Sequence, residues 1–122
     1  MNEERLLELQ TISYQIQQLQ EQLQLIEEQF MELSVLSESL ESLKHSKASD
    51  GLIPVGAGVF IEGAIKNTEK VILNVGSNVM VKKSIEDAKN LVEKQIHETR
   101  EVAEQIKEEI NHGLIELRKL EE

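Results

Sequence analysis

Apolar residues in the first part of the chain recur in alternating steps of three and four. Residues 1–44 contain no Gly or Pro, so this stretch can form one long helix. The alternation puts the apolar side chains on one stripe, which is the heptad pattern of a coiled coil. Gln and Glu fill most other positions, so the stripe is narrow and suits one partner helix. It consists of Leu9, Ile12, Ile16, Leu19, Leu23, Ile26, Phe30, Leu33 and Leu40.

A second heptad stripe runs through the last part of the chain. Ser84, three residues before Asp87, resembles a capping box and predicts the start of this helix, with Ile85 as its first apolar residue. Small residues and one Thr occupy stripe positions, which weakens this helix as a zipper on its own. The stripe consists of Val92, Ile96, Thr99, Ala103, Ile106, Ile110, Gly113, Leu117 and Leu120.

Small residues of the second stripe match bulky residues of the first if the helices fold back on each other. Pairing positions whose numbers add to 129 sets Ile16 against Gly113 and Ile26 against Ala103. Such matching favours close packing, so we expect an antiparallel coiled coil within one chain. A parallel dimer of two chains is the alternative that the heptads leave open. Further pairs in this register are Leu9–Leu120, Ile12–Leu117, Leu19–Ile110, Leu23–Ile106 and Phe30–Thr99.

Between the helices the hydrophobic period changes to two. Five of the six glycines and the only proline lie in residues 51–76. They separate four β-branched runs and predict two consecutive hairpins, with Pro54 at an edge or a strand end. The runs are residues 52–55, 59–65, 71–75 and 79–82.

One face of these strands is aliphatic, whereas the other is mixed. So small a sheet cannot bury that face alone, and a two-helix hairpin has no spare surface to cover it. Exposed strand edges also tend to pair with other strands. We therefore expect an obligate oligomer assembled through the sheet. The predicted oligomerisation residues are Val59, Ile61, Ile65, Val71, Leu73, Val75, Val79 and Val81.

The predicted fold class is α+β, mainly α. It comprises a long antiparallel two-helix coiled coil with two central hairpins that assemble between subunits. We expect one structural unit, in which a linker follows the first helix and the hairpins precede the second. The predicted bounds are 1–44 for the first helix, 45–51 for the linker, 52–82 for the hairpins and 83–122 for the second helix.

Composition narrows the function classes. The 122 residues include 13 Lys and Arg against 23 Asp and Glu, a net charge of −10, which disfavours nucleic acid as a partner. No Cys is present, which excludes disulfides and thiolate sites. No window approaches the about 18 apolar residues of a membrane span, and Glu3 and Glu4 argue against a signal peptide. We expect a cytoplasmic protein that does not bind membranes.

No constellation of residues predicts catalysis, a metal site or a cofactor. His45, His97 and His112 lack ligand spacing, and adjacent glutamates such as Glu108 and Glu109 point in different directions on a helix. The glycines of residues 56–58 lack the Lys of a phosphate loop. We therefore expect no enzyme, no metal and no cofactor.

Several apolar residues near the two termini lie off the heptad stripes. Their heptad positions point away from the partner helix. If the protein holds unfolded clients, these residues are the candidate contacts. Isolated exposed apolar residues are common on protein surfaces, which is the alternative interpretation. Leu25, Val35 and Leu91 are off the stripe too, and we interpret them as scattered surface residues. The candidate client-binding residues are Leu6, Leu7, Tyr14, Leu114 and Ile115.

Three segments carry a resemblance to a known family: LIPVGAG at 52–58, TEKVILNVG at 68–76 and VKKSIEDA at 81–88. With two hairpins between long helices, the chain closely resembles the alpha-type subunits of the prefoldin family. The resemblance implies a hexamer of two alpha and four beta-type subunits with a double β-barrel and six coiled coils. It also implies that unfolded proteins are held at the coiled-coil tips and passed to a group II chaperonin without ATP. A structural coiled-coil adapter that docks one defined partner is the competing hypothesis.

Overall fold

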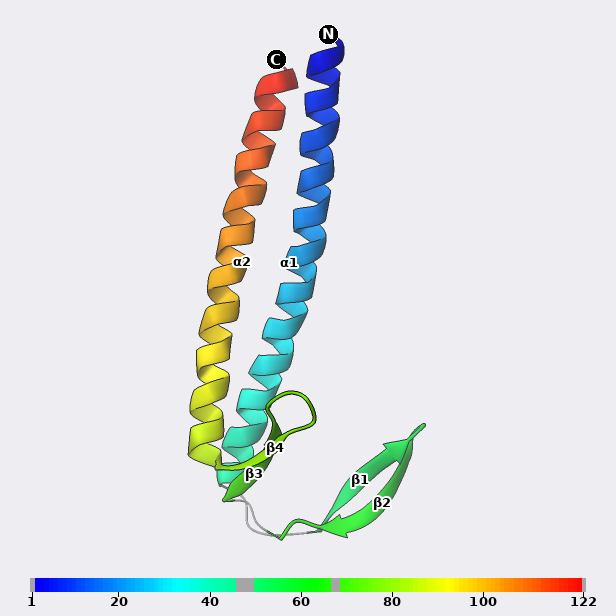
Figure 1. Cartoon of the computed structure of the whole chain (residues 1–122). Helices are drawn as coiled ribbons and strands as arrows, with labels where there is room; N and C mark the ends of the chain where they lie inside the picture. Colours follow the sequence, from blue (N-terminus) through cyan, green and yellow to red (C-terminus); the bar gives the residue numbers. More distant parts are fainter. Residues whose placement is uncertain (1, 46–49, 67–68, 122) are drawn as a thin grey trace. The chain divides into compact units, whose positions relative to one another are not determined.

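Along the chain, one long helix precedes two β-hairpins and a second long helix follows them. The computed structural model describes residues 2–45, 50–66 and 69–121, and Figure 1 shows the order of the elements. The predicted class, mainly helical with two antiparallel strand pairs, is confirmed. The elements are α1 (Glu3–Lys44), β1 (Asp50–Gly56), β2 (Val59–Ala64), β3 (Lys70–Asn74), β4 (Met80–Ser84) and α2 (Ile85–Glu121).

The chain divides into two compact units, which we describe separately. The helical unit comprises Met1–Ser34 and Gln95–Glu122, and the hairpin unit comprises Val35–Lys94. Both long helices contribute to both units, because each boundary falls inside a helix. That the chain acts as one structural unit stays a prediction.

In the helical unit, α1 and α2 run antiparallel in the predicted register. A Cβ atom placed on Gly113 would lie 3.0 Å from Cγ1 of Ile16, so these two stripe positions face each other. Ile16 and Ile106 are buried, at 7% and 8% exposure. The remaining stripe residues of this unit are half-buried. Pairing of the helices within one chain is therefore confirmed.

Two side-chain contacts complete the helical unit. The backbone N–H of Arg5 donates a 2.8 Å hydrogen bond to Oδ1 of Asn2, which caps the start of α1. The guanidinium of Arg100 lies 5.4 Å from the ring centroid of Phe30, within the range of a cation–π contact. Arg100 is the neighbour of Thr99, the predicted partner of Phe30, so this contact agrees with the predicted register.

In the hairpin unit, four apolar residues of α1 and α2 form a small core. Leu40, Ile85 and Val92 are buried, and Ala88 has 0% exposure. Leu40 and Val92 are predicted stripe residues, and Ile85 is the predicted first apolar residue of the second helix. Ala88 was not predicted, although it lies three residues after Ile85 and so on the same helix face.

Helix α2 begins at Ile85, two residues after the predicted bound of 83. The backbone N–H of Asp87 donates to Oγ of Ser84 at 3.1 Å, so Ser84 caps the helix as its spacing indicates. The N–H of Ile85 donates to the carbonyl of Glu69 at 3.0 Å. Strand pairing of β4 continues up to the cap, with Ser84 opposite Lys70, and this displaces the helix start.

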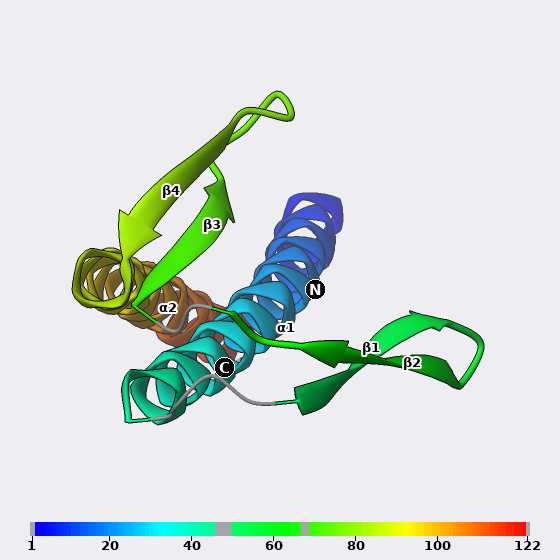
Figure 2. The same cartoon turned by 90° about the horizontal axis from the view of Figure 1, so that it is seen from below.

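The two hairpins are separate two-stranded sheets (Figure 2). In the first, Ile53 pairs with Ile61, and the register shifts between Pro54 and Gly56. Strand β1 begins at Asp50, within the predicted linker of residues 45–51, because Asp50 and Gly51 pair with Ala64 and Gly63. A Cβ atom on Gly63 would crowd the end of the Ile53 side chain, which would then have to shift. Linker residues 46–49 lie outside the described residues.

The second hairpin closes through a tight turn at residues 76–79. The N–H of Val79 donates to the carbonyl of Gly76 at 2.9 Å, and Ser77 and Asn78 have φ of 50° and 61°. Two consecutive positive φ angles identify a type I′ turn, which matches the twist of paired strands. Leu73 pairs with Val81 in the ladder. The prediction of two hairpins is thus confirmed.

Candidate functional site

An apolar groove lies between α1 and α2 in the helical unit, beside Gly113. Its volume is about 530 Å³. Stripe residues of both helices line it, among them the half-buried Ile12 and Leu19 and the buried Ile16. Polar and acidic side chains form the rim. The lining residues are Ile12, Tyr14, Gln15, Ile16, Gln18, Leu19, Glu108, Glu109, His112, Gly113 and Glu116.

A second groove adjoins the first and extends toward the start of α1. Its volume is about 600 Å³, and it shares Ile12, Gln15 and Glu116 with the first groove. We call the two together the helical groove. The lining of this second part is Leu7, Glu8, Thr11, Ile12, Gln15, Glu116, Lys119 and Leu120.

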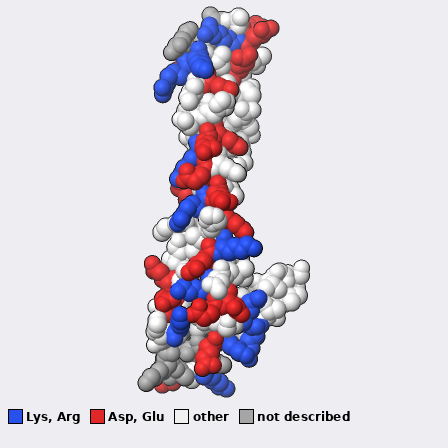
Figure 3. Space-filling model, turned by 90° about the vertical axis from the view of Figure 1, so that its left-hand side faces the viewer, with Lys and Arg blue, Asp and Glu red and all other residues white. Residues whose placement is uncertain are grey.

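The helical groove is acidic. Its first part is lined by three glutamates and by no Lys or Arg, and Nε2 of His112 lies 3.2 Å from Oε1 of Glu116. By sequence, the helical unit has 15 acidic and 5 basic residues, whereas the hairpin unit has 8 of each. The whole net charge of −10 therefore belongs to the helical unit. Figure 3 shows acidic side chains distributed along one face of the molecule.

The five candidate client-binding residues are all exposed, at 43% to 62%. Leu7 and Tyr14 line the helical groove, whereas Leu6, Leu114 and Ile115 are not among its lining residues. The structure therefore brings only part of the predicted set to one surface. The sequence analysis missed the groove itself. The available signal was Gly113, a stripe position without a side chain.

Other off-stripe apolar residues are exposed along the helices. Leu25, Val35 and Leu91 are exposed, as expected for scattered surface residues. Three similar exposed residues were not predicted: Met31, Leu36 and Val102.

The hairpins expose apolar side chains on both faces. Of the eight predicted oligomerisation residues, Val71, Leu73 and Val81 are half-buried, and the other five are exposed. Further exposed apolar residues lie on strand β1 and on the face that was predicted to be mixed. These additions are Leu52, Ile53, Val55, Phe60, Ile72 and Met80.

Comparison with known proteins decides the family. A family model described as prefoldin subunit matches residues 12–121. The chain belongs to the prefoldin family. Its relatives include the prefoldin subunit alpha of Methanococcus maripaludis strain C5, which is 38% identical over 91% of this chain and 75% of the relative.

Two further prefoldin alpha subunits support the assignment, and one solved structure has the same fold. The Thermofilum pendens subunit is 30% identical over 97% of this chain and 93% of its own length. The match to the Methanobrevibacter smithii subunit is 35% identical and covers 63% of this chain and 53% of that subunit. A chain of filamentous PFD from Methanocaldococcus jannaschii has the same fold, with a TM-score of 0.81 at 21% identity, covering 93% and 94% of the two chains. The chain is thus a prefoldin subunit that resembles the alpha type.

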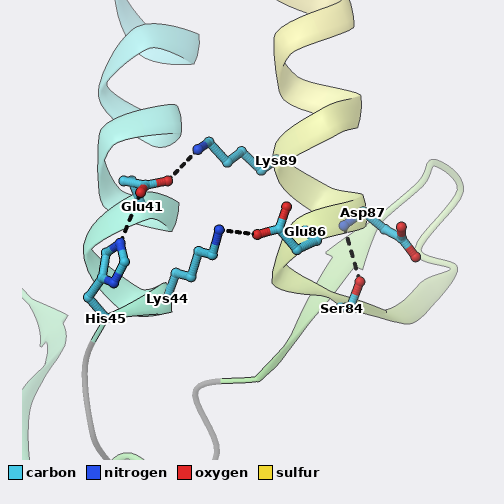
Figure 4. A network of polar contacts seen from close by, with 7 residues as sticks. All are labelled: Glu41, Lys44, His45, Ser84, Glu86, Asp87 and Lys89. Carbon is cyan, nitrogen blue, oxygen red and sulfur yellow. Dashed lines mark hydrogen bonds and ion pairs between the residues drawn. The ribbon is translucent and has the colours of Figure 1, made fainter.

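Ion pairs join α1 and α2 of this prefoldin subunit within the hairpin unit (Figure 4). Lys89 pairs with Glu41, and Lys44 pairs with Glu86. His45 also contacts Glu41, at 3.0 Å. The pairs lie where the hydrophobic core ends, so they hold the two helices together beside it.

These contacts shift three pKa values. The hydrogen bond from Lys89, supported by His45, lowers the pKa of Glu41, and the same bond raises the pKa of Lys89. The hydrogen bond from Lys44 lowers the pKa of Glu86. Each shift favours the charged form, so the arrangement suits ion pairing.

The histidines of the prefoldin subunit lie apart from one another. His97 contacts Glu101 at 3.1 Å, which repeats the i, i+4 pairing of His112 with Glu116. Within residues 2–45, 50–66 and 69–121, no group of three or more His, Cys, Asp or Glu could hold a metal ion. Among these same residues, we find no helix with the length and apolar character needed to cross a bilayer.

Proposed function

We propose that this chain is a subunit of an ATP-independent chaperone that holds unfolded proteins and delivers them to a group II chaperonin. The observation that carries the proposal is the exposure of apolar side chains in the helical unit. Leu7 and Tyr14 are each 62% exposed and border an apolar groove. Unfolded chains differ from folded ones in their exposed apolar segments, and such a surface is complementary to them.

Weak contacts of this kind can hold a client only in combination. Partial burial of one aliphatic side chain contributes about 1 kcal/mol, at about 25 cal/mol per Å². Several helical units acting on one unfolded chain would multiply these contacts through effective concentration. The proposed holding mechanism therefore requires an oligomer, and it requires no nucleotide hydrolysis.

The hairpin unit supports assembly with other subunits. Its exposed apolar faces and unpaired strand edges are unfavourable in an isolated chain. We propose that β1 to β4 join strands of four beta-type subunits and a second alpha-type chain in a double β-barrel, with the eight predicted oligomerisation residues at the contacts. In this assembly the barrel positions six helical pairs around one client. We place the complex in the cytoplasm.

A structural adapter that docks one defined partner is the alternative function. The helical groove favours it, because a groove of fixed lining can select one ligand. The two functions differ in the breadth of clients. An adapter protects its one partner, whereas a holding chaperone protects many unrelated unfolded proteins.

The test is to mix the chain with a beta-type subunit and to measure aggregation of several unrelated denatured proteins by light scattering, without ATP. Protection of all of them supports the holding function. A control is an unrelated two-helix coiled coil with polar residues off its stripe, which should protect none. Protection of only one protein, or of none, would contradict the proposal.

A further inference from the structure

We propose that the helical groove selects basic apolar segments of unfolded clients over acidic ones. This inference rests on the proposed holding function and adds the class of segment that is held. It follows from two properties of the same surface, an apolar floor and an acidic rim. Neither property alone would identify an occupant.

The floor of the groove can accept apolar side chains. Ile12 and Leu19, both half-buried, line it beside the buried Ile16. From Leu7 to Leu19, the α1 side of the groove runs for twelve residues, which corresponds to about 18 Å of helix. An extended client segment of about five residues matches this length.

The rim favours positive charge. Glu108, Glu109 and Glu116 line the first part of the groove without any Lys or Arg. In the second part, Glu8 joins Glu116, and Lys119 is the one basic lining residue. A client segment with Lys or Arg beside its apolar residues can therefore place each cation near a carboxylate. An acidic segment meets like charge along the whole first part.

Charge also disfavours a second copy of this chain as the occupant. The helical unit carries the entire net charge of −10, so two helical units repel each other at moderate salt. A basic segment of another protein has no such penalty. Steering by the same field would increase its rate of association.

The test uses the full 122-residue chain, alone and mixed with a beta-type subunit, and two labelled peptides. Both peptides have about twelve residues with the same leucines and the same Ser and Gly spacers, and they carry either Lys or Glu at the charged positions. Fluorescence anisotropy at about 50 mM salt measures binding. We expect the basic peptide to bind about tenfold more tightly, which corresponds to three partly exposed ion pairs.

Two matched variants distinguish the effect of the groove glutamates from the effect of the net negative charge of the chain. The groove variant combines Glu108→Gln, Glu109→Gln and Glu116→Gln, and the control combines Glu98→Gln, Glu101→Gln and Glu104→Gln. Each removes three charges from α2, and each removes one His–Glu contact. The preference for the basic peptide should fall to about twofold or less in the groove variant and should persist in the control.

A photo-crosslinker locates the bound peptide. Gln18 lines the groove, whereas Gln29 is exposed on the same helix and is not among the lining residues. A crosslinker at position 18 should capture the basic peptide, and one at position 29 should not. Equal capture at both positions would contradict binding in the groove.

The outcomes distinguish this inference from the proposed function. Equal binding of both peptides, or an unchanged preference in the groove variant, overturns the charge selection and leaves the holding function in place. Self-association that depends on the three glutamates also overturns it, because the occupant is then a second copy. Failure to bind either peptide, together with failure to protect denatured clients, overturns both.

Discussion

Gly113 of α2 lies directly against Ile16 of α1, with Cγ1 of Ile16 3.0 Å from the place of a Cβ atom on Gly113. This separation is tighter than most contacts of real Cβ atoms. The contact fixes the register of the two helices in the helical unit, because a shift by one heptad would put Ile16 opposite another residue. It also leaves the neighbouring apolar side chains open to the helical groove.

Enlarging Gly113 should destabilise the helical unit. Gly113→Leu overpacks the contact and should lower the free energy of unfolding by about 1–3 kcal/mol, despite the better helix propensity of Leu. Combining it with Ile16→Ala, which makes room, should cost less than the sum of the two single substitutions. Thermal unfolding followed by circular dichroism measures all four proteins. Strict additivity would mean that the two positions do not touch.

The antiparallel register can be tested by crosslinking. The chain has no natural Cys, so Leu19→Cys with Ile110→Cys gives one unique pair. We expect a short thiol crosslinker to join them within one chain. The control is Leu19→Cys with Ile96→Cys, since Ile96 lies 14 residues from Ile110, or about 21 Å along α2. Products between two chains only would support the parallel dimer.

A charge on the hairpins should prevent assembly. Replacing Ile61 or Leu73 with Lys buries an unpaired charge if these side chains contact another subunit, at a cost of several kcal/mol. The control is Glu62→Lys on the other face of β2, a position that already accepts a charge. Size-exclusion chromatography with light scattering measures the complex formed with a beta-type subunit. A full-sized complex of the Ile61 variant would show that its face is not buried.

The ion pair between Glu41 and Lys89 should make stability depend on acid pH. Because the folded-state pKa of Glu41 is lowered, its stabilisation is fully present above the ordinary pKa of Glu. It is lost as the pH falls below that value and through the lower folded-state pKa. Glu41→Gln should therefore reduce the fall of the melting temperature in this range. Glu38→Gln, also exposed on α1, is the control. Parallel pH profiles for wild type and Glu41→Gln would contradict the role of the pair.

The five candidate client-binding residues should act together. Changing Leu6, Leu7, Tyr14, Leu114 and Ile115 to Ser should weaken protection of denatured clients, while single changes have little effect. Assembly and most helicity should persist, because none of the five lies on a stripe or in a strand. Light scattering of a diluted client, beside circular dichroism, measures both effects. We expect a partial loss of protection in a mixed complex. Full protection by the variant would mean that these five residues are ordinary exposed residues and do not bind clients.

The sequence predicts the helices and hairpins well because local rules specify them. Heptad spacing identifies the stripes, Ser84 identifies the start of α2 to within two residues, and glycines mark the turns. The burial of Ala88 was not predicted, because a small residue adds little to a hydrophobic pattern even where it is fully buried. The extra strand residues Asp50 and Gly51 were not predicted either, because their pairing depends on the partner strand.

The candidate site is less predictable than the fold. The helical groove arises from side chains of two helices about a hundred residues apart in sequence, so no single segment contains its pattern. Exposure of Leu7 and Tyr14 follows from their heptad positions, whereas their position beside the groove follows from the packing at Gly113. The ion pair of Lys89 with Glu41 likewise requires the register before it can be inferred.

The uniform three-four spacing of the stripes makes the length of the paired helices adjustable in engineering. Removing residues 20–26 together with 103–109, which the register of 129 places opposite each other, deletes one complete heptad from each helix. Every remaining stripe residue keeps its phase and its partner, and the pair becomes about 10 Å shorter. Deleting seven residues from one helix alone would instead mismatch every layer beyond the cut. A series of such paired deletions or insertions would act as a molecular ruler, with which the reach of the helices can be set in steps of two turns.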